Sequence, residues 1–230
     1  MRASRRLTGL ACLLLVVAVP GLAQQAAEPT VGFSCDFPGS NPSHYGFSVT
    51  SNRSASYISD GKVNKDSATD PSSGADAPFR MDFILSPATT AHIFDLAKAA
   101  RYFEGEIDSK KKNLASTGEK TLMYRDASKS NIANYNYSPV PAVQELTALF
   151  QDLSSTVEFG RRLEHEYRYQ KLALDEEMKR MEETTAQETW PDLAAAAPIL
   201  QKILDDPSVI NTVRARAQRL LQHAAAPSGK

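Results

Sequence analysis

Apolar and polar residues alternate in short runs over the first half of the chain, and turn-forming residues separate these runs. Residues 46–50 and 55–59 alternate on either side of Asn52-Arg53, which indicates a hairpin of two strands. Residues 79–85 alternate over their whole length, as expected of a half-buried strand. These runs predict a sheet whose strands follow one another along the chain.

A second group of strands is expected between residues 113 and 137. Residues 113–117 and 120–125 flank Gly118-Glu119 and indicate another hairpin. Tyr135 and Tyr137 then alternate with asparagines, which is typical of a further short strand.

Ser-Pro pairs precede the two places where the periodicity becomes helical. Ser86-Pro87 introduces a stretch with helical spacing that is predicted to end near Phe103, and Ser138-Pro139 introduces a second one. Serine can cap free backbone N–H groups, and proline at the first helical position already has a helical φ angle. Two such strand-to-helix units predict an α+β fold, with a mostly antiparallel sheet and helices on one face.

Apolar residues continue three or four positions apart far beyond the second Ser-Pro pair, which predicts one helix over residues 140–184. Such a helix is roughly 65 Å long and must extend beyond the sheet. Its outer face after Gly160 is densely charged, which is typical either of a solvated surface or of a helix whose narrow apolar stripe meets a partner helix. The chain itself can supply that partner. The candidate partner-binding residues on the stripe are Leu163, Tyr167, Leu174, Met178 and Met181.

Two shorter helices are expected near the C-terminus. The first follows Trp190-Pro191, and Asp206-Pro207 separates it from the second, which runs to about Leu221. The two form a predicted helical hairpin. Residues 191–222 resemble a HEAT-type hairpin, which implies a mode of helix packing rather than a function.

The N-terminal 23 residues have the composition of an export signal. Arg2, Arg5 and Arg6 precede an apolar run over residues 10–19, and small residues follow near Ala23. The run is shorter than the roughly 20 residues that span a bilayer, although a retained membrane anchor is the alternative. We therefore expect an exported protein, periplasmic or secreted, with no transmembrane span after signal cleavage.

The predicted organisation is a signal peptide at 1–23, a lead-in segment at 24–44, an α+β sheet domain at 45–158, a helical extension and hairpin at 159–224, and a disordered tail at 225–230.

Charge and cysteine content narrow the class of partner. Removing the signal takes away three of the 26 basic residues and none of the 27 acidic ones, which leaves a net charge of about −4. Such a chain gives no indication of nucleic acid binding. Cleavage also removes Cys12 and leaves Cys35, so no intramolecular disulfide is expected. Cys35 is then either a small buried apolar side chain or a reactive thiol.

No motif points to catalysis, a cofactor or a metal. His165-Glu166 begins the H-E-x-x-H pattern of zinc helices, but its fifth position is Tyr169 and the second histidine ligand is missing. We therefore predict no catalytic residues, no metal site and no cofactor, although sites built from distant residues leave an enzyme possible.

Tyrosines supply the candidate ligand-binding residues. Tyr124, Tyr135 and Tyr137 fall on strands expected to be adjacent, where they could form an exposed aromatic platform. The alternative is that they are half-buried residues of the sheet.

The alternation at 79–83, the helix at 93–98 with Tyr102-Phe103, and the segment from residue 121 to Tyr137 resemble a family of exported bacterial α+β proteins of unknown function. The resemblance spans residues 45–153 and implies an envelope or secreted module without assigning any active-site residue. We therefore expect a non-enzymatic binding or scaffold protein of the cell envelope or secreted fraction. Its partner would be an unidentified protein or envelope component, and its oligomeric state stays open. The alternative is an extracytoplasmic hydrolase or an enzyme inhibitor.

Overall fold

The computed structural model describes residues 28–60, 78–111, 113–187 and 192–225. The predicted signal peptide and nearly all of the predicted tail lie outside the described residues. The strands are β1 (Thr30–Asp36), β2 (His44–Thr50), β3 (Ser54–Ser59), β4 (Phe79–Ile84), β5 (Glu119–Arg125) and β6 (Ser130–Tyr135). The longer helices are α1 (Pro87–Ala99), α2 (Pro141–Tyr169), α3 (Leu174–Gln187), α4 (Ala197–Asp205) and α5 (Asn211–Ala225), and the short 3-10 helices are η2 (Arg101–Phe103), η3 (Lys171–Ala173) and η4 (Leu193–Ala196).

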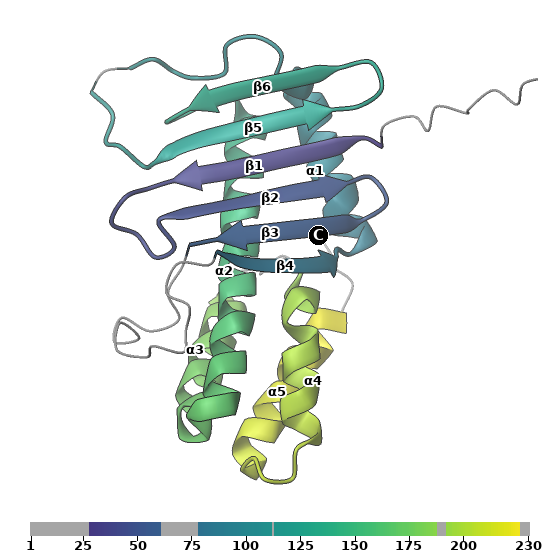
Figure 1. The fold of residues 1–230 in the computed structure, drawn as a ribbon, viewed down its shortest axis with the longest axis vertical. Helices are drawn as coiled ribbons and strands as arrows, with labels where there is room; N and C mark the ends of the chain where they lie inside the picture. The colour runs from purple at the N-terminus through teal and green to yellow at the C-terminus, as the bar shows by residue number, and fades with distance from the viewer. Residues whose placement is uncertain (1–27, 61–77, 112, 188–191, 226–230) are drawn as a thin grey trace, which may run out of the picture.

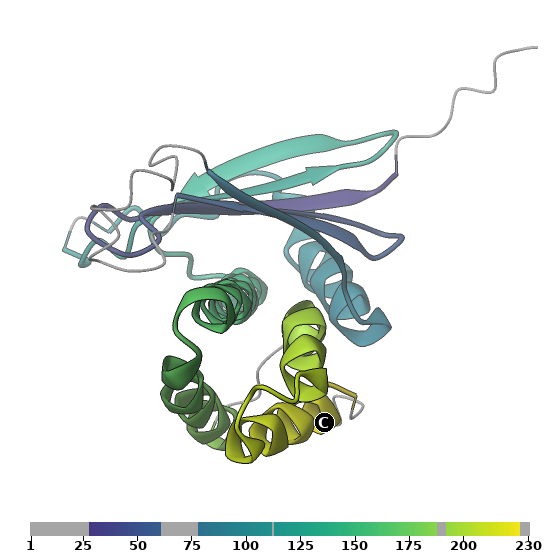
Figure 2. The same cartoon turned by 60° about the horizontal axis from the view of Figure 1, so that its bottom comes forward.

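The strands form one six-stranded sheet in the order β4-β3-β2-β1-β5-β6, and every neighbouring pair is antiparallel. The predicted α+β fold is confirmed, and so is the hairpin that β2 and β3 form around Asn52-Arg53. All the helices lie on one side of the sheet (Figure 2). Among the described residues, no helix covers the opposite face of the sheet.

Two sequence-based expectations for the sheet were wrong. Strand β1 lies in the middle of the sheet, although the lead-in segment at 24–44 was expected to precede the sheet domain. Val31, Phe33 and Cys35 alternate with small residues there and bury one face. The hairpin expected around Gly118 does not form, since residues 113–117 are not a strand and β5 pairs instead with β1 and β6. Gly118 only leads the chain into β5.

Packing of α2 and α1 against the sheet makes the first hydrophobic core. Phe150 of α2 stacks on Phe33 with 5.0 Å between ring centroids and lies 5.4 Å from Phe47. In Figure 1, α2 crosses behind the strands and continues well past β4. Burial of aromatic side chains from both layers fixes the first half of α2 on the sheet.

The helix boundaries follow the predicted signals in one case and depart from them in two. Ser86 caps α1, and its hydroxyl accepts a hydrogen bond from the Thr89 backbone N–H at 3.1 Å. Helix α1 ends at Ala99 rather than near Phe103, because the backbone turns left-handed at Arg101–Phe103. Helix α2 begins at Pro141, one residue after its expected start, but Val140 rather than Ser138 occupies the N-cap position.

The single long helix expected over residues 140–184 is wrong. Helix α2 ends at Tyr169, and after a short turn α3 folds back beside α2 (Figure 2). An ion pair of 2.7 Å between Arg162 and Glu177 joins positions on either side of this turn. The periodicity predicted the apolar face correctly, but residues 170–173 contain neither Gly nor Pro to indicate the break.

A second hydrophobic core lies among α2, α3, η4, α4 and α5. The predicted C-terminal hairpin is present, since α4 ends at Asp205 and α5 begins at Asn211. On α2, Val157 is the last residue of the first core and Phe159 is the first residue of the second. One helix therefore carries both a sheet module (residues 28–158) and a helical module (residues 159–225).

The helices of the described residues include none that combines the length and the apolar character needed to cross a membrane.

Glycines at positive φ allow a test of two loops that flank the central strands. Gly39 and Gly118 have nearly equal φ angles of +92° and +91°. A Cβ at Gly39 would meet nothing within 4 Å, whereas a Cβ at Gly118 would lie 2.9 Å from the Asp36 carbonyl oxygen. We expect Gly39→Ala to cost about 1–2 kcal/mol and Gly118→Ala to cost about 1–3 kcal/mol more, because backbone crowding adds to the shared φ strain. Urea denaturation measures both, and equal losses would contradict the packing at Gly118.

A charge cluster of Arg162, Glu166, Glu177 and Arg180 fills the contact between α2 and α3. The buried Glu177 carboxylate pairs with both arginines. The Oε2 atom of Glu166 is buried with no hydrogen-bond partner among the described residues. Burial raises the pKa of Glu166, and the two arginines offset part of this rise.

The two glutamates should therefore respond differently to removal of charge. Glu177→Gln should cost about 1.5–3 kcal/mol, because its charge-assisted hydrogen bond to Arg162 is lost, while the two arginine side chains left behind are 37% and 67% exposed to water. Glu166→Gln should cost much less at pH 7. In the wild-type protein the free energy of unfolding should rise as the pH falls from the raised folded-state pKa of Glu166 to about 4.3, because the buried carboxylate becomes protonated. Glu166→Gln should abolish this rise. Denaturation curves between pH 8 and pH 4 test this, and the prediction fails if both variants lose the same stability at pH 7.

Candidate binding site

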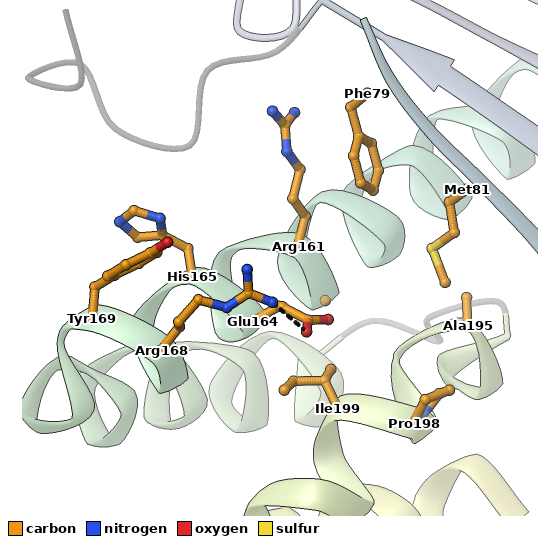
Figure 3. Close-up of a pocket in the computed structure, with 11 residues that line it drawn as sticks. Phe79, Met81, Arg161, Glu164, His165, Arg168, Tyr169, Ala195, Pro198 and Ile199 are labelled. Atoms are coloured by element: carbon orange, nitrogen blue, oxygen red, sulfur yellow. Dashed lines mark hydrogen bonds and ion pairs between the residues drawn. The ribbon is translucent and has the colours of Figure 1, made fainter. Parts of the chain in front are cut away.

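A cavity of about 310 Å³ lies where the sheet module meets the helical module. Strand β4, which is an edge strand of the sheet, supplies Phe79 and Met81 to its lining. The second half of α2 supplies the charged wall, and η4 with α4 supplies an apolar wall opposite (Figure 3). We call this cavity the junction cleft. Its lining residues are Phe79, Met81, Gly160, Arg161, Glu164, His165, Arg168, Tyr169, Ala195, Pro198 and Ile199.

Arg161 is the most buried cation of the cleft, with 18% of its side chain exposed. Its guanidinium carbon lies 4.5 Å from the centroid of the Phe79 ring, which is the geometry of a cation–π contact (Figure 3). Its Nη1 lies 3.5 Å from the Glu158 Oε2, at the long limit of a hydrogen bond. The guanidinium is thus held on an aromatic ring beside a carboxylate.

Glu158 is itself fixed by the sheet. Its Oε1 accepts hydrogen bonds from the Tyr57 hydroxyl at 2.9 Å and from the Ser59 hydroxyl at 2.6 Å. The Tyr57 oxygen also lies 3.0 Å from the Ser154 hydroxyl. Burial raises the pKa of Tyr57, and the negative charge of Glu158 raises it further, so the phenol stays a donor. This buried network joins β3 to α2 and sets the position of Arg161.

The outer rim of the cleft is more exposed and more loosely bonded. Arg168 and Lys202 both approach Glu164, at 3.4 Å and 3.7 Å from its Oε1. The rings of His165 and Tyr169 lie 5.0 Å apart on the side away from Met81 (Figure 3). Ion pairs this exposed contribute little to stability, so the rim can rearrange around a ligand.

Hydrogen bonds at both ends fix the apolar wall of the cleft. At one end the Asp192 carboxylate accepts a hydrogen bond of 2.7 Å from the Ser86 backbone N–H, which ties η4 to the start of α1. At the other end Asp206 accepts from Tyr167 at 2.7 Å and from Lys171 at 2.9 Å. These donors lower the pKa of Asp206, with Lys171 contributing most. The cleft therefore lies between two walls that are each bonded to the rest of the fold.

The aromatic platform expected from Tyr124, Tyr135 and Tyr137 was wrong. Tyr124 and Tyr135 are buried on the helix-covered face of the sheet, and only Tyr137 is exposed. The Tyr135 hydroxyl lies 2.6 Å from the Thr147 hydroxyl inside the core. The alternation could not show that Tyr124 and Tyr135 faced the helices. Their burial supports the alternative that they are residues of the sheet, whereas Tyr137 lies beyond the end of β6.

The predicted partner-binding stripe is covered by the chain's own helices. Leu163, Leu174, Met178 and Met181 are buried in the second core, and Tyr167 is packed against it. Among the interpretations left open for this stripe, the structure therefore agrees with the one in which the chain supplies the partner.

The residues that define the cleft were not found from the sequence. Arg161 was assigned only to a charged helix face, and Phe79 only to a strand. Glu158 lies about one hundred positions from Tyr57 and Ser59, so no local spacing links them. Only the packing of α2 across the sheet brings these groups together.

Cys35 and the metal-ligating residue types are the other candidate chemistry in the described part of the chain. Cys35 is buried in the first core, and this burial raises the pKa of its thiol. Within the four described ranges, no three His, Cys, Asp or Glu residues lie together in a group that could hold a metal ion.

Comparisons with known proteins add no assignment: no protein-family model and no curated protein matches this chain. A proposal for the function therefore depends on the geometry of the junction cleft.

Removal of the Tyr57 hydroxyl tests the network that positions Arg161. Tyr57→Phe should cost about 1.5–3 kcal/mol, because a buried carboxylate loses a charge-assisted hydrogen bond. Tyr124→Phe is a matched control, since its hydroxyl also donates to a carboxylate, that of Asp126 at 2.9 Å, but in a turn at the surface. The control should lose less than about 1 kcal/mol. Chemical denaturation measures both, and a smaller loss for Tyr57→Phe than for the control would contradict the role of the network.

Proposed function

We propose that the protein is an exported, non-enzymatic binding protein whose ligand is held in the junction cleft. The observation that carries this proposal is the cleft's lining, in which the anchored Arg161 lies beside Phe79 at one edge and an apolar wall includes Ala195 and Ile199. Ligand sites are typically concave, largely apolar and supplied with a few fixed polar groups. A volume of about 310 Å³ suits a small molecule or a single side chain of a partner.

Preorganisation supports a binding role. Arg161 is positioned by Phe79 and Glu158, and Glu158 by two hydroxyl groups of β3. A binding group that is already ordered loses little conformational entropy when the ligand arrives. The sheet thus supplies rigidity, and the exposed rim on α2 supplies adaptability.

The N-terminal sequence supports the export part of the proposal. Three arginines, an apolar run and small residues stand in the order of a cleaved signal, and cleavage near Ala23 leaves a chain with one cysteine. The ligand would accordingly be met in the periplasm or outside the cell. The resemblance to exported bacterial α+β proteins is consistent with this setting but identifies no ligand.

Export is tested by expressing the full chain in a bacterial host, fractionating the cells and sequencing the N-terminus of the recovered protein. We expect a soluble extracytoplasmic protein that begins near Gln24. A Val16→Asp variant, which interrupts the apolar run, should stay in the cytoplasm with Arg2 still present. Recovery of the unprocessed wild-type chain from the cytoplasm or the membrane would contradict export.

Binding in the cleft is tested by screening a metabolite library with ligand-observed NMR against two tryptophan variants. Met81→Trp on β4 should fill the cleft and abolish binding of the hits. Ile132→Trp on β6 is the control, because this side chain is 66% exposed at the opposite edge of the sheet. Hits that bind both variants equally would contradict the site, and hits that are converted into products would favour the hydrolase alternative.

A further inference from the structure

We infer that the junction cleft selects small organic carboxylates with a compact aromatic or branched apolar body, and that Arg161 is the group that recognises the carboxylate. This inference rests on the proposed function and adds the chemical class of the ligand. Its three supports are the donor capacity of Arg161, the charge balance of the lining and the shape of the apolar wall.

Most N–H donors of the Arg161 guanidinium make no hydrogen bond within the described residues. A guanidinium carries five N–H donors, and among the described residues Arg161 makes one hydrogen bond, the 3.5 Å contact to Glu158. The short bonds of Glu158 go instead to Tyr57 and Ser59. Stacking on the Phe79 ring occupies a face of the guanidinium and leaves the donors in its plane available. These donors match the two oxygens of a carboxylate in the bidentate geometry that arginine favours.

The charges around the cleft favour one negative charge on the ligand. Arg161 and Arg168 line it, and Lys202 lies 3.7 Å from Glu164 at the rim. Two carboxylates, Glu158 and Glu164, lie among these three cations. A carboxylate would balance the remaining positive charge, whereas a dianionic phosphate would be repelled by the two glutamates.

The apolar wall of the cleft selects the body of the ligand. Met81, Ala195, Pro198 and Ile199 present apolar atoms to the cavity (Figure 3). A bare inorganic anion would leave these atoms in contact with water, so it would gain nothing from burying them. The volume of about 310 Å³ accommodates a single ring or a branched chain. A phenyl-substituted short-chain acid therefore combines the two features.

The test compares phenylacetate with phenylacetamide, which has nearly the same shape and no charge, by isothermal titration calorimetry on the purified protein. Acetate serves as the ligand without an apolar body, and phenyl phosphate as the dianion. We expect phenylacetate to bind at least about tenfold more tightly than each of the other three. Phenylacetamide lacks the charge-assisted hydrogen bond, acetate lacks the apolar body, and phenyl phosphate carries a second negative charge.

Substitution of Arg161 then assigns the selectivity to one group. Arg161→Gln should reduce phenylacetate affinity about tenfold or more and leave phenylacetamide affinity unchanged, so that the two ligands bind alike. Arg168→Gln is the matched control and should change either affinity less than about threefold, because its side chain is exposed at the rim. Arg161→Lys keeps the charge without the planar fork, so it should retain part of the preference if Arg161→Gln fails to fold.

The outcomes separate this inference from the function on which it rests. Equal affinity for phenylacetate and phenylacetamide in the wild-type protein, or no measurable binding of either, overturns the carboxylate assignment. Either result leaves cleft binding intact if library hits still lose affinity in Met81→Trp. A preference for phenylacetate that survives both Met81→Trp and Arg161→Gln would overturn the inference and the cleft site together.

Discussion

The packing of α2 against two separate hydrophobic cores is the constraint on which the rest of the structure depends. Its first half presents Val143, Leu146 and Phe150 to the sheet, and its second half presents Phe159 and Leu163 to the helical module. Because one continuous helix serves both cores, the position of the helical module is set by how α2 lies on the strands. The junction cleft is a consequence of this arrangement.

The buried carboxylate of Glu158 lies where α2 passes from one core to the other. Its hydroxyl donors come from β3, and its cationic neighbour Arg161 lines the cleft beside Phe79 of β4. Burying a carboxylate is costly unless it is hydrogen-bonded, so this polar group restricts the registers that α2 can adopt on the sheet. The interaction that fixes the fold at this point also positions the group proposed to bind the ligand. Glu158, which fixes α2 on the sheet, and Arg161, which is proposed to bind the ligand, therefore lie on the same turn of α2.

Local signals in the sequence predicted local structure well. Alternation located β2, β3 and β4, a serine cap located the start of α1, and Asp206-Pro207 located the break between α4 and α5. Features set by distant contacts were missed. The turn after Tyr169 has no glycine or proline, and it forms because folding back buries Leu174 and Met178 against the other helices. The side of the sheet on which Tyr124 and Tyr135 are buried was likewise decided by distant contacts, with Tyr102 for Tyr124 and with Thr147 of α2 for Tyr135.

The cleft could not be predicted because its walls come from strand β4, helix α2 and helix α4, which are far apart in the sequence. The most direct test of the account is a crystal structure of the protein with bound phenylacetate. We predict that the carboxylate lies within hydrogen-bond distance of the Arg161 guanidinium and that the ring packs against Met81 and Ile199. A ligand bound elsewhere on the protein, or bound in the cleft with its carboxylate turned away from Arg161 into solvent, would contradict the account.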